Sequence, residues 1–488
     1  MSRSQPARLC RFPALVARWI AVELIGFVAW IPLGLWTCSA SCGMQILPAE
    51  SDLASAEALC REYLESDDDL LRSRLSRRLE AYDGEIELVI AALSRRRLVP
   101  LKAGYHPELT FVSPAMQEKY PKDLLYFIVP DSYDEKKPTG LIVFLHGGGL
   151  NTFRDAAMYT MQLPDSDSSP SDFRSGRMLA ATGMITVGPS APGKGKSAYR
   201  WCLKESEQYI LDVIEDSKSR FNIDPDRVFL LGHSMGGFGA FHHALRQPDR
   251  FAAIIVSSGA WDCGFWPVLR GTPMCIVQGC RDAEKGSRWH YTDVAYARHT
   301  VDILQRERLE YTYFEHDGTH GFSENRADIA RYFDSAKQLQ RDPYFPHIAL
   351  ATPQGFTWNY LNRVRHNRWL SIDETLDGKI EVDELDSQGE DFDEWRLVHR
   401  RSPHDGASLE ANNRGNNEFE VIARNIKKFT VWLHPQMIDM NKPIVIVVNG
   451  REQFRSLVTP SLTIALQSYE RRHDWGMIYP IKVTLPRY

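Results

Sequence analysis

The chain has 488 residues, of which 43% are hydrophobic and 25% charged. At roughly 150 residues per domain, this length predicts two to three folded units, and the composition is typical of a globular protein rather than a disordered one. Because 58 Lys and Arg stand against 63 Asp and Glu, for a net charge of −5, the chain has no basic excess that would indicate a nucleic-acid partner or attachment to an anionic membrane.

Residues 1–41 have the pattern of an export signal. Residues 1–18 carry arginines and no acidic residue, the apolar run Leu24–Trp36 follows, and Ser39-Ala40-Ser41 supplies small residues after it. This order is typical of a removable secretory signal. The alternative is a retained membrane anchor, although a spanning helix needs about 20 apolar residues. We therefore expect an exported protein that is secreted, periplasmic or anchored through its N-terminus.

The cysteines leave two interpretations open. An exported protein can form a disulfide among Cys202, Cys263, Cys275 and Cys280, but free buried thiols fit the sequence equally well. The spacing contains no paired C-x-x-C pattern of the kind that binds zinc. We therefore predict neither a metal nor another cofactor.

Residues 50–115 are predicted to form a helical N-terminal extension that packs on the main domain. Leucines recur at near-helical spacing at Leu70, Leu71, Leu75 and Leu79, among charged residues. No residue in this stretch indicates chemistry.

Residues 116–342 alternate between short apolar runs and helical stretches. Continuous apolar runs are typical of strands that are covered on both faces, and their alternation with helices predicts an α/β domain with a doubly wound, mostly parallel sheet. Helices are expected at Ser206–Arg220 and Phe238–Arg246. The expected strands are Leu125–Val129, Leu141–Leu145, Met184–Val187, Val228–Leu231, Ala253–Val256, Met274–Val277 and Tyr311–Phe314.

Residues 350–488 differ in sequence pattern from the preceding domain, from which a predicted linker at Asp342–Pro346 separates them. Short strand-like segments with turn signals predict a β-rich accessory domain resembling a β-sandwich. Asn449-Gly450 is a strong signal for a tight hairpin turn. The expected strands are Arg368–Ile372, Glu418–Ala423, Phe429–Leu433, Ile444–Val448 and Ile478–Leu485.

The strongest chemical motif is Gly232-His233-Ser234-Met235-Gly236, which lies between an apolar strand and a helix rich in small residues. A serine hydroxyl is a weak nucleophile that a neighbouring base must activate. In this context the motif predicts a strained strand-to-helix turn that exposes Ser234 as a nucleophile, with the backbone N–H of Met235 directed at the developing oxyanion.

A second motif, His146-Gly147-Gly148-Gly149, ends an earlier strand. Glycines there let backbone N–H groups approach a substrate carbonyl oxygen, so Gly148 or Gly149 is the candidate for the second oxyanion donor. We also list His146 as a candidate substrate-binding residue.

The acid and the base are expected after the serine, in that order. Asp282 follows the strand Met274–Val277 and is the preferred acid, with Asp262 as its rival. His320 lies in a glycine-flanked loop beyond the last strand and is the preferred base, whereas His316 is closer to the strand end and is expected to be structural.

Two further motifs are discounted. Residues 188–197 imitate a phosphate-binding loop, but the spacing fails, and we predict a surface loop beside the active site with Arg200 and Trp201 contacting substrate. Residues 373–384 fit part of a calcium-binding loop. Their flanks look like strands rather than helices, so we predict a β-hairpin turning at Asp377-Gly378.

The segment Asn222-Ile223-Asp224-Pro225-Asp226-Arg227, followed by Met235-Gly236-Gly237, resembles secreted esterases of the polyhydroxybutyrate-depolymerase and feruloyl-esterase type. It also resembles the catalytic domain of prolyl-oligopeptidase-like peptidases. The resemblance covers roughly residues 120–340 and implies the α/β-hydrolase fold with a triad of Ser234, Asp282 and His320. Gln278 stands where many members have histidine.

These observations predict an exported serine carboxylic-ester hydrolase without a stable protein partner. The resemblance favours side-chain esters of polysaccharides or short polyesters as substrates. A serine peptidase and a non-catalytic binder on a hydrolase fold are the alternatives. A carbohydrate-binding role for the tail is a further hypothesis, with Trp369, Trp395, Trp432 and Trp475 as the stacking residues.

Overall fold

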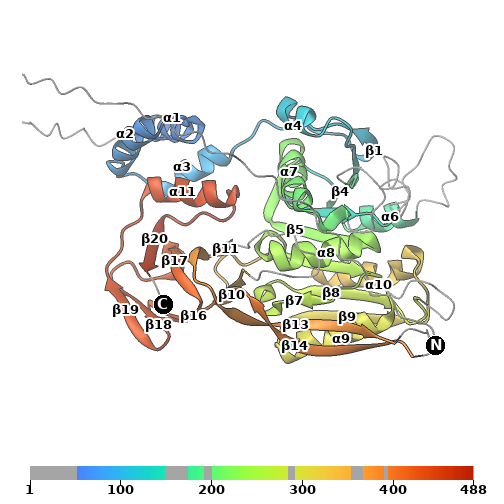
Figure 1. The fold of residues 1–488 in the computed structure, drawn as a ribbon. Coiled ribbons are helices and arrows are strands. Elements are labelled where there is room, and N and C mark those ends of the chain that lie inside the picture. Colours follow the sequence, from blue (N-terminus) through green and yellow to red (C-terminus); the bar gives the residue numbers. More distant parts are fainter. Residues whose placement is uncertain are drawn as a thin grey trace, which may run out of the picture. The chain divides into compact units, whose positions relative to one another are not determined.

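A computed structural model describes residues 52–148, 174–191, 200–283, 292–352, 366–389 and 394–486. These residues belong to one compact unit, Pro48–Tyr488 (Figure 1). Within the described ranges no helix combines the length and the apolar character that crossing a membrane requires. The predicted export signal lies outside the described residues.

The N-terminal helices are α1 (Leu53–Glu65), α2 (Asp69–Glu80) and α3 (Ile86–Ser94). Asp52 and Asp68 cap the first two, since their carboxylates accept backbone N–H groups of the first turn. The apolar faces share one core with Leu462 and Leu466 of α11 (Leu462–Arg472), beside which they lie in Figure 1. The first three helices therefore pack on a helix near the C-terminal end of the chain. The later part of the extension does lie on the hydrolase part, since Phe111 belongs to its core and the Val99 N–H donates to the Ser219 carbonyl of α7 (Lys204–Arg220) at 3.0 Å.

The segment after α3 is not helical throughout, which corrects the predicted helical extension over 50–115. Gly104–Leu109 forms strand β1, which pairs antiparallel with β2 (Leu125–Val129), and the short helix α4 (Pro114–Lys119) joins the two. Residues 104–109 therefore belong to the large sheet. The alternation of polar and apolar residues that would have indicated this edge strand is interrupted at His106-Pro107.

The large sheet has eight strands in the order β1-β2-β4-β3-β5-β6-β8-β9. Its outer pairs β1–β2 and β2–β4 are antiparallel, and the pairs from β4–β3 onward are parallel. This arrangement confirms the predicted α/β fold with a mostly parallel sheet. The remaining bounds are β3 (Thr139–Leu145), β4 (Ile185–Pro189), β5 (Ile223–His233), β6 (Ala253–Ser257), β8 (Met274–Gly279) and β9 (Tyr311–His316).

The apolar runs of these strands are continuous because the sheet is buried on both faces. Along β3, Leu141, Val143 and Leu145 enter one core, while Ile142 and Phe144 enter the other. Helices α7 (Lys204–Arg220) and α8 (Met235–Arg246) cover the first face, and α6 (Arg174–Ala181) and α10 (Phe322–Ala336) cover the second. Helix α9 (Val294–Arg306) packs into the first core near β8 and β9.

The C-terminal region contains two sheets that enclose one core. A five-stranded sheet has the order β10-β15-β16-β18-β19, and a four-stranded sheet has the order β11-β12-β17-β20. Two facing sheets around a common apolar core form a sandwich, as predicted. The bounds are β10 (His347–Ala351), β11 (His366–Asn367), β12 (Leu370–Thr375), β15 (Ser408–Gly415), β16 (Glu418–Arg424), β17 (Ile426–Leu433), β18 (Ile444–Val448), β19 (Arg451–Ser456) and β20 (Ile481–Pro486).

The turn at Asn449-Gly450 forms as predicted. It connects β18 and β19 with two residues, and both have positive φ angles, 48° and 78°. This is the backbone of a type I′ turn, which asparagine and glycine adopt at the lowest cost.

The predicted hairpin at Asp377-Gly378 is wrong, although both strands exist. β12 pairs with β17, whereas β13 (Lys379–Gln388) pairs with β14 (Arg396–Asp405) and with β7 (Cys263–Gly264). Asp377-Gly378 therefore carries the chain from one sheet to another. The short strand β7 follows β6, so this three-stranded sheet joins the two halves of the chain.

The tryptophans proposed to bind carbohydrate pack against other residues of the protein. Trp369 is fully buried and donates to the carbonyl of Phe345, and Trp432 is buried and donates to Ser371. These two are core residues and present no face to a sugar, contrary to the hypothesis. Trp395 packs against the core beside the large sheet, and Trp475 stacks on the ring of Tyr469 at 3.8 Å.

Candidate active site

Ser234 lies at the turn from β5 into α8 and has φ 54° and ψ −117°. This backbone conformation is strained for a residue with a side chain, and it persists only where the surroundings enforce it. Glycines make the turn possible: a Cβ on Gly232 would lie 1.9 Å from the carbonyl oxygen of Gly236, and one on Gly236 would lie 1.9 Å from that of Leu145. The Ser234 N–H is held by the Ser257 carbonyl at 2.9 Å.

The structure brings Ser234, His320 and Asp282 together. The Nε2 atom of His320 lies 2.7 Å from Ser234 Oγ, and its Nδ1 atom lies 2.8 Å from Asp282 Oδ2. The three residues follow the carboxyl ends of the parallel strands β5, β8 and β9. Carboxyl ends of parallel strands meet at one edge of a sheet, which is where open α/β sheets place their sites.

Asp282 is buried and accepts further hydrogen bonds. Gln278 Nε2 donates to its Oδ2 at 2.9 Å, and the Thr292 hydroxyl donates to its Oδ1 at 2.8 Å. Gln278, which stands where the resembled families often have histidine, therefore helps to fix the carboxylate. Sequence reasoning singled out neither donor for this task. The position of Gln278 at the end of β8, shortly before Asp282, could have indicated that it contacts the carboxylate. Thr292 lies in a loop whose sequence gives no such indication.

The two alternative candidates, Asp262 and His316, have other hydrogen-bond partners than Ser234, His320 and Asp282. The backbone carbonyl of Asp262 accepts the N–H of Leu385 in β13, and Asp282 rather than Asp262 accepts from His320. His316 contacts Asn325 Oδ1 at 2.6 Å, and the amide of Asn325 in turn donates to Ser257 and Ser258. His316 is thus part of a buried polar network beneath the serine turn.

The charge arrangement suits proton transfer from Ser234. If Nδ1 of His320 carries its proton toward Asp282, then Nε2 presents a lone pair to the serine hydroxyl. Burial, together with the nearby His320, lowers the pKa of His233 to about 3. His233 is therefore neutral near pH 7, and no second cation from the serine motif competes with the imidazolium that forms on His320.

The candidate oxyanion donors lie around the serine. Met235 is the first residue of α8, and the first N–H groups of a helix have no intrahelical acceptor. Gly147 packs against the serine turn, since a Cβ there would lie 3.1 Å from Ser234 Cβ. Gly148 is exposed with φ 133°, a conformation that glycine alone adopts readily. Gly149 lies outside the described residues.

The predicted substrate contacts of His146 and Trp201 are wrong, because both side chains are fully buried. His146 Nε2 accepts the Ala191 N–H at 3.1 Å and its Nδ1 faces the Gly147 carbonyl, so the ring braces the glycine loop from behind. Trp201 donates to the His146 carbonyl at 3.0 Å and packs under α8. Arg200 begins the short 3-10 helix η2 (Arg200–Cys202), and its side chain is not among the described ones.

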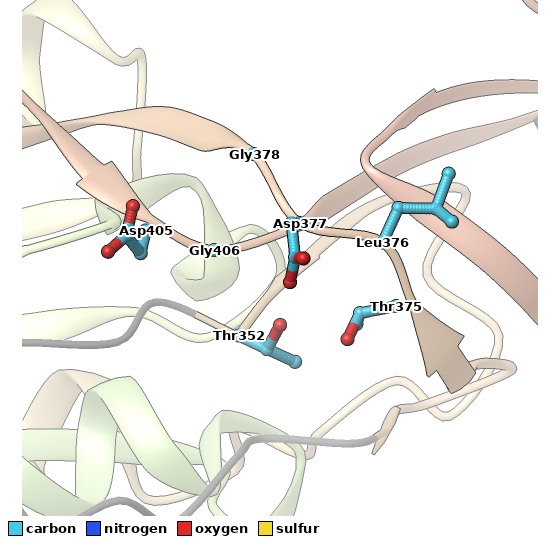
Figure 2. A pocket seen from close by; sticks show the side chains of 7 residues that line it. All are labelled: Thr352, Thr375, Leu376, Asp377, Gly378, Asp405 and Gly406. Atoms are coloured by element: carbon cyan, nitrogen blue, oxygen red, sulfur yellow. The ribbon is translucent and has the colours of Figure 1, made fainter.

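A hollow on the surface of the C-terminal region is separate from this site. Figure 2 shows it between the β12–β13 and β14–β15 connections, where the side-chain oxygen atoms of Asp377, Thr352 and Thr375 lie toward one another. Neither Ser234 nor Asp282 nor His320 lines it.

The described cysteines are free thiols and form no disulfide with one another, as one of the two interpretations of the sequence had it. They are Cys60, Cys202, Cys263, Cys275 and Cys280.

The strand order and the strained serine turn between β5 and α8 are those of the α/β-hydrolase fold. A family model described as serine aminopeptidase, S33, matches residues 173–275, which include β5, Ser234 and α8. Over that segment the chain is similar to serine hydrolases of this fold.

Particular relatives match only parts of the chain. It is 25% identical over 146 residues to dipeptidyl-peptidase 5 of Porphyromonas gingivalis, which covers 28% of this chain and 19% of that protein. It is 31% identical over 100 residues to the bifunctional acetylxylan esterase/xylanase XynS20E of Neocallimastix patriciarum, which covers 20% and 15%. The chain thus spans less than a fifth of the length of either curated relative.

Solved structures also match the chain. S-formylglutathione hydrolase FrmB from Staphylococcus aureus matches with a TM-score of 0.35 at 20% identity and covers 50% of this chain and 100% of its own. The ferulic acid esterase AmCE1/Fae1A from Anaeromyces mucronatus, in complex with ferulic acid, matches with a TM-score of 0.35 at 14% identity and covers 50% and 94%.

Proposed function

We propose that the chain hydrolyses carboxylic esters through an acyl-enzyme formed on Ser234. The observation that carries the proposal is the position of His320, with one ring nitrogen 2.7 Å from the serine hydroxyl and the other 2.8 Å from a buried carboxylate. His320 takes the hydroxyl proton as Ser234 Oγ attacks the ester carbonyl. Asp282 holds the ring in the required tautomer and stabilises the imidazolium.

The remaining steps use the same residues. The backbone N–H of Met235 and a second N–H from Gly148 or Gly149 stabilise the oxyanion of the tetrahedral intermediate. The imidazolium then returns its proton to the departing alcohol, which leaves the acyl group on Ser234. A water molecule, deprotonated by His320, cleaves the acyl-enzyme and restores the serine.

For the substrate, we propose side-chain esters of polysaccharides or short polyesters. The match to an acetylxylan esterase/xylanase supports the polysaccharide class, and it comes from sequence rather than from fold alone. A panel of p-nitrophenyl, feruloyl and acetyl-sugar esters, with Ser234→Ala as the control, tests this. Turnover of simple p-nitrophenyl esters without any activity on the sugar and feruloyl esters would remove the polysaccharide class and leave the ester hydrolase.

A serine peptidase is the second candidate, because the family model and dipeptidyl-peptidase 5 both belong to peptidases. The same triad serves amide hydrolysis, so the geometry does not separate the two. Parallel assays of matched ester and peptide-amide substrates do so. A kcat/KM for a peptide amide that exceeds that of the matched ester would reverse the assignment.

A non-catalytic binder is the third candidate. A fluorophosphonate probe is expected to label Ser234 in the wild-type chain and to leave Ser234→Ala unlabelled, since labelling requires an activated serine. Equal labelling of both chains, or labelling of neither, would contradict the proposed chemistry.

We also propose that the protein is exported, on the pattern of residues 1–41. Expression in a bacterial host followed by fractionation and intact-mass measurement tests this. A mature chain that has lost the N-terminal segment supports a cleaved signal, a full-length chain in the membrane fraction supports the anchor, and a full-length chain confined to the cytoplasm contradicts export.

A further inference from the structure

Three side chains with metal-binding atoms meet on the small sheet that joins the two halves of the chain. They are Cys263 of β7, Glu384 of β13 and His404 of β14, and their ligand atoms all lie within 4.8 Å of one another. Cys263 is 7% exposed. The side chains of His404 and Glu384 are 17% and 15% exposed. The site is therefore shielded but still accessible to an ion and a water molecule.

The strand register produces this meeting. Glu384 pairs with Cys263 on one side and with Arg400 on the other, and His404 pairs with Ile380 further along the same hairpin. Positions four residues apart on a strand point to the same face. Glu384 and His404 thus share the face of β13 and β14 that carries the buried Ile380, where Cys263 also packs.

The local charges favour a cation. The carboxylates of Asp262, Glu384 and Asp383 lie near the Cys263 thiol. Two arginines partly balance these charges: Arg306 pairs with Asp383 at 2.6 Å, and the Nε atom of Arg400 donates to Glu384 Oε2 at 3.0 Å. The other oxygen, Oε1, faces His404 Nε2 at 2.7 Å. One carboxylate oxygen is therefore fixed by arginine while the second is directed at the shared space.

We propose that Cys263, Glu384 and His404 bind a transition-metal ion of the zinc class. A thiolate, an imidazole and a carboxylate are the ligand types that zinc prefers, and three protein ligands with one water complete a tetrahedral shell. Ligands around zinc lie roughly 3.3 to 3.7 Å apart, so small side-chain rotations suffice to close the site. Arg400 acts from outside the shell by orienting Glu384.

Binding exchanges a proton for the metal. The Cys263 S–H bond breaks, its proton passes to the solvent, and a sulfur–metal bond forms with no change in oxidation state. The ring proton that His404 donates to Glu384 moves by way of solvent to the other ring nitrogen, so that the neutral imidazole presents a lone pair. The hydrogen bond between the two residues is then replaced by bonds from both to the ion. The bound ion cross-links β7, which follows β6 of the large sheet, to the β13–β14 hairpin. The inferred role is structural and does not depend on the proposed esterase activity.

Cobalt binding tests the proposal directly. The full-length chain, reduced and stripped with a chelator, is titrated with Co²⁺. We expect one equivalent to give a near-ultraviolet thiolate-to-cobalt absorption together with visible bands of a tetrahedral ion, and Zn²⁺ to displace both. In Cys263→Ala the thiolate absorption disappears, and in His404→Gln the affinity for Zn²⁺ falls at least about tenfold.

Two matched variants control for other sites. His399 lies on the same strand as His404 and contacts Asp383 at 2.8 Å, without a thiol in the group. Cys60 is a buried free thiol in the helical core. His399→Gln and Cys60→Ala should therefore retain the cobalt spectrum and the zinc affinity. Absence of the thiolate absorption in the wild-type chain, or its persistence in Cys263→Ala, would overturn the proposal, and ester hydrolysis measured alongside would stand in either case.

Discussion

At the scale of single residues, the site depends on how a buried carboxylate is held. Both oxygens of Asp282 accept hydrogen bonds, from Gln278, Thr292 and His320. A hydroxyl can rotate to accept as well as donate. An asparagine at 282 can therefore turn its amide nitrogen to Thr292 and keep its oxygen toward His320, so that substitution removes the charge while preserving the geometry.

We expect Asp282→Asn to lower kcat by about 10²- to 10⁴-fold, because a neutral amide stabilises the imidazolium of His320 far less than a carboxylate does. Steady-state kinetics on a p-nitrophenyl ester measure the effect, and circular dichroism verifies the fold. The rival acid provides the control: Asp262→Asn should leave kcat within a few-fold of the wild type. The reverse pattern would assign the acid to Asp262.

His233 gives a prediction about pH and stability. Its folded-state pKa is lowered from 6.5 to about 3, chiefly by burial and secondly by the charge of His320. Between these two values the unfolded chain binds a proton at this residue and the folded chain does not, so the contribution of neutral His233 to stability is lost as pH falls from about 6.5 toward 3. Denaturant unfolding of His233→Asn should show a shallower loss of stability over this interval than the wild type. An identical pH dependence for both chains would contradict the assignment.

At the scale of elements, the serine is positioned by the close approach of α8 to β3 and β5. Gly236 permits this approach, because a Cβ there would lie 1.9 Å from the Leu145 carbonyl oxygen, and backbone atoms cannot move aside cheaply. Gly239 does the same against Trp201, whose Cβ would lie 2.3 Å from an added Cβ. The helix that starts at the nucleophile is thus seated by glycines along one face.

Gly236→Ala should force α8 away from β3 and abolish measurable ester hydrolysis, with a melting temperature lowered by several degrees. Gly321→Ala is the comparison, because a Cβ added at Gly321 would lie 3.4 Å from the nearest atom, which is an ordinary van der Waals contact. That variant should retain the wild-type melting temperature to within about one degree. Thermal unfolding and initial rates on both variants test the prediction, and a fully active Gly236→Ala chain would contradict it.

At the scale of the whole molecule, a buried ionic cluster joins the hydrolase part to the C-terminal region. Asp474 accepts from Arg341 at 2.6 Å and from Arg250 at 3.2 Å. Asp249, which follows α8, accepts from the backbone N–H of Arg368 at 3.0 Å. Arg341 also contacts Asp226 of the Asn222–Arg227 segment at 2.7 Å. That segment therefore serves to attach the C-terminal region.

Asp474→Ala should reduce the free energy of unfolding by about 3 to 5 kcal/mol, because it removes the buried carboxylate that Arg341 and Arg250 share and leaves Asp226 as the remaining ion-pair partner of Arg341. Urea unfolding followed by fluorescence measures the loss. Glu452→Ala breaks an exposed pair with Arg455, which solvent screens, and should therefore cost far less than Asp474→Ala. Equal losses in the two variants would show that the cluster contributes nothing beyond an exposed ion pair.

The sequence alone was sufficient for features that depend on neighbouring residues. The apolar runs located the parallel strands, the glycines around Ser234 located the strained turn, and Asn449-Gly450 located a hairpin turn. The order of serine, aspartate and histidine along the chain also reduced the candidates to few positions. These signals are local because backbone preference and hydrophobic period act over a few residues.

Only the tertiary structure decided which side chains are buried and which distant residues meet. It placed His146 and Trp201 behind the glycine loop, α1–α3 against α11, and Cys263 beside Glu384 and His404. Each of these contacts joins segments tens to hundreds of residues apart, and no short-range preference specifies such a partner. They form because sheet register and packing of apolar faces bring the segments together, which is a property of the whole fold.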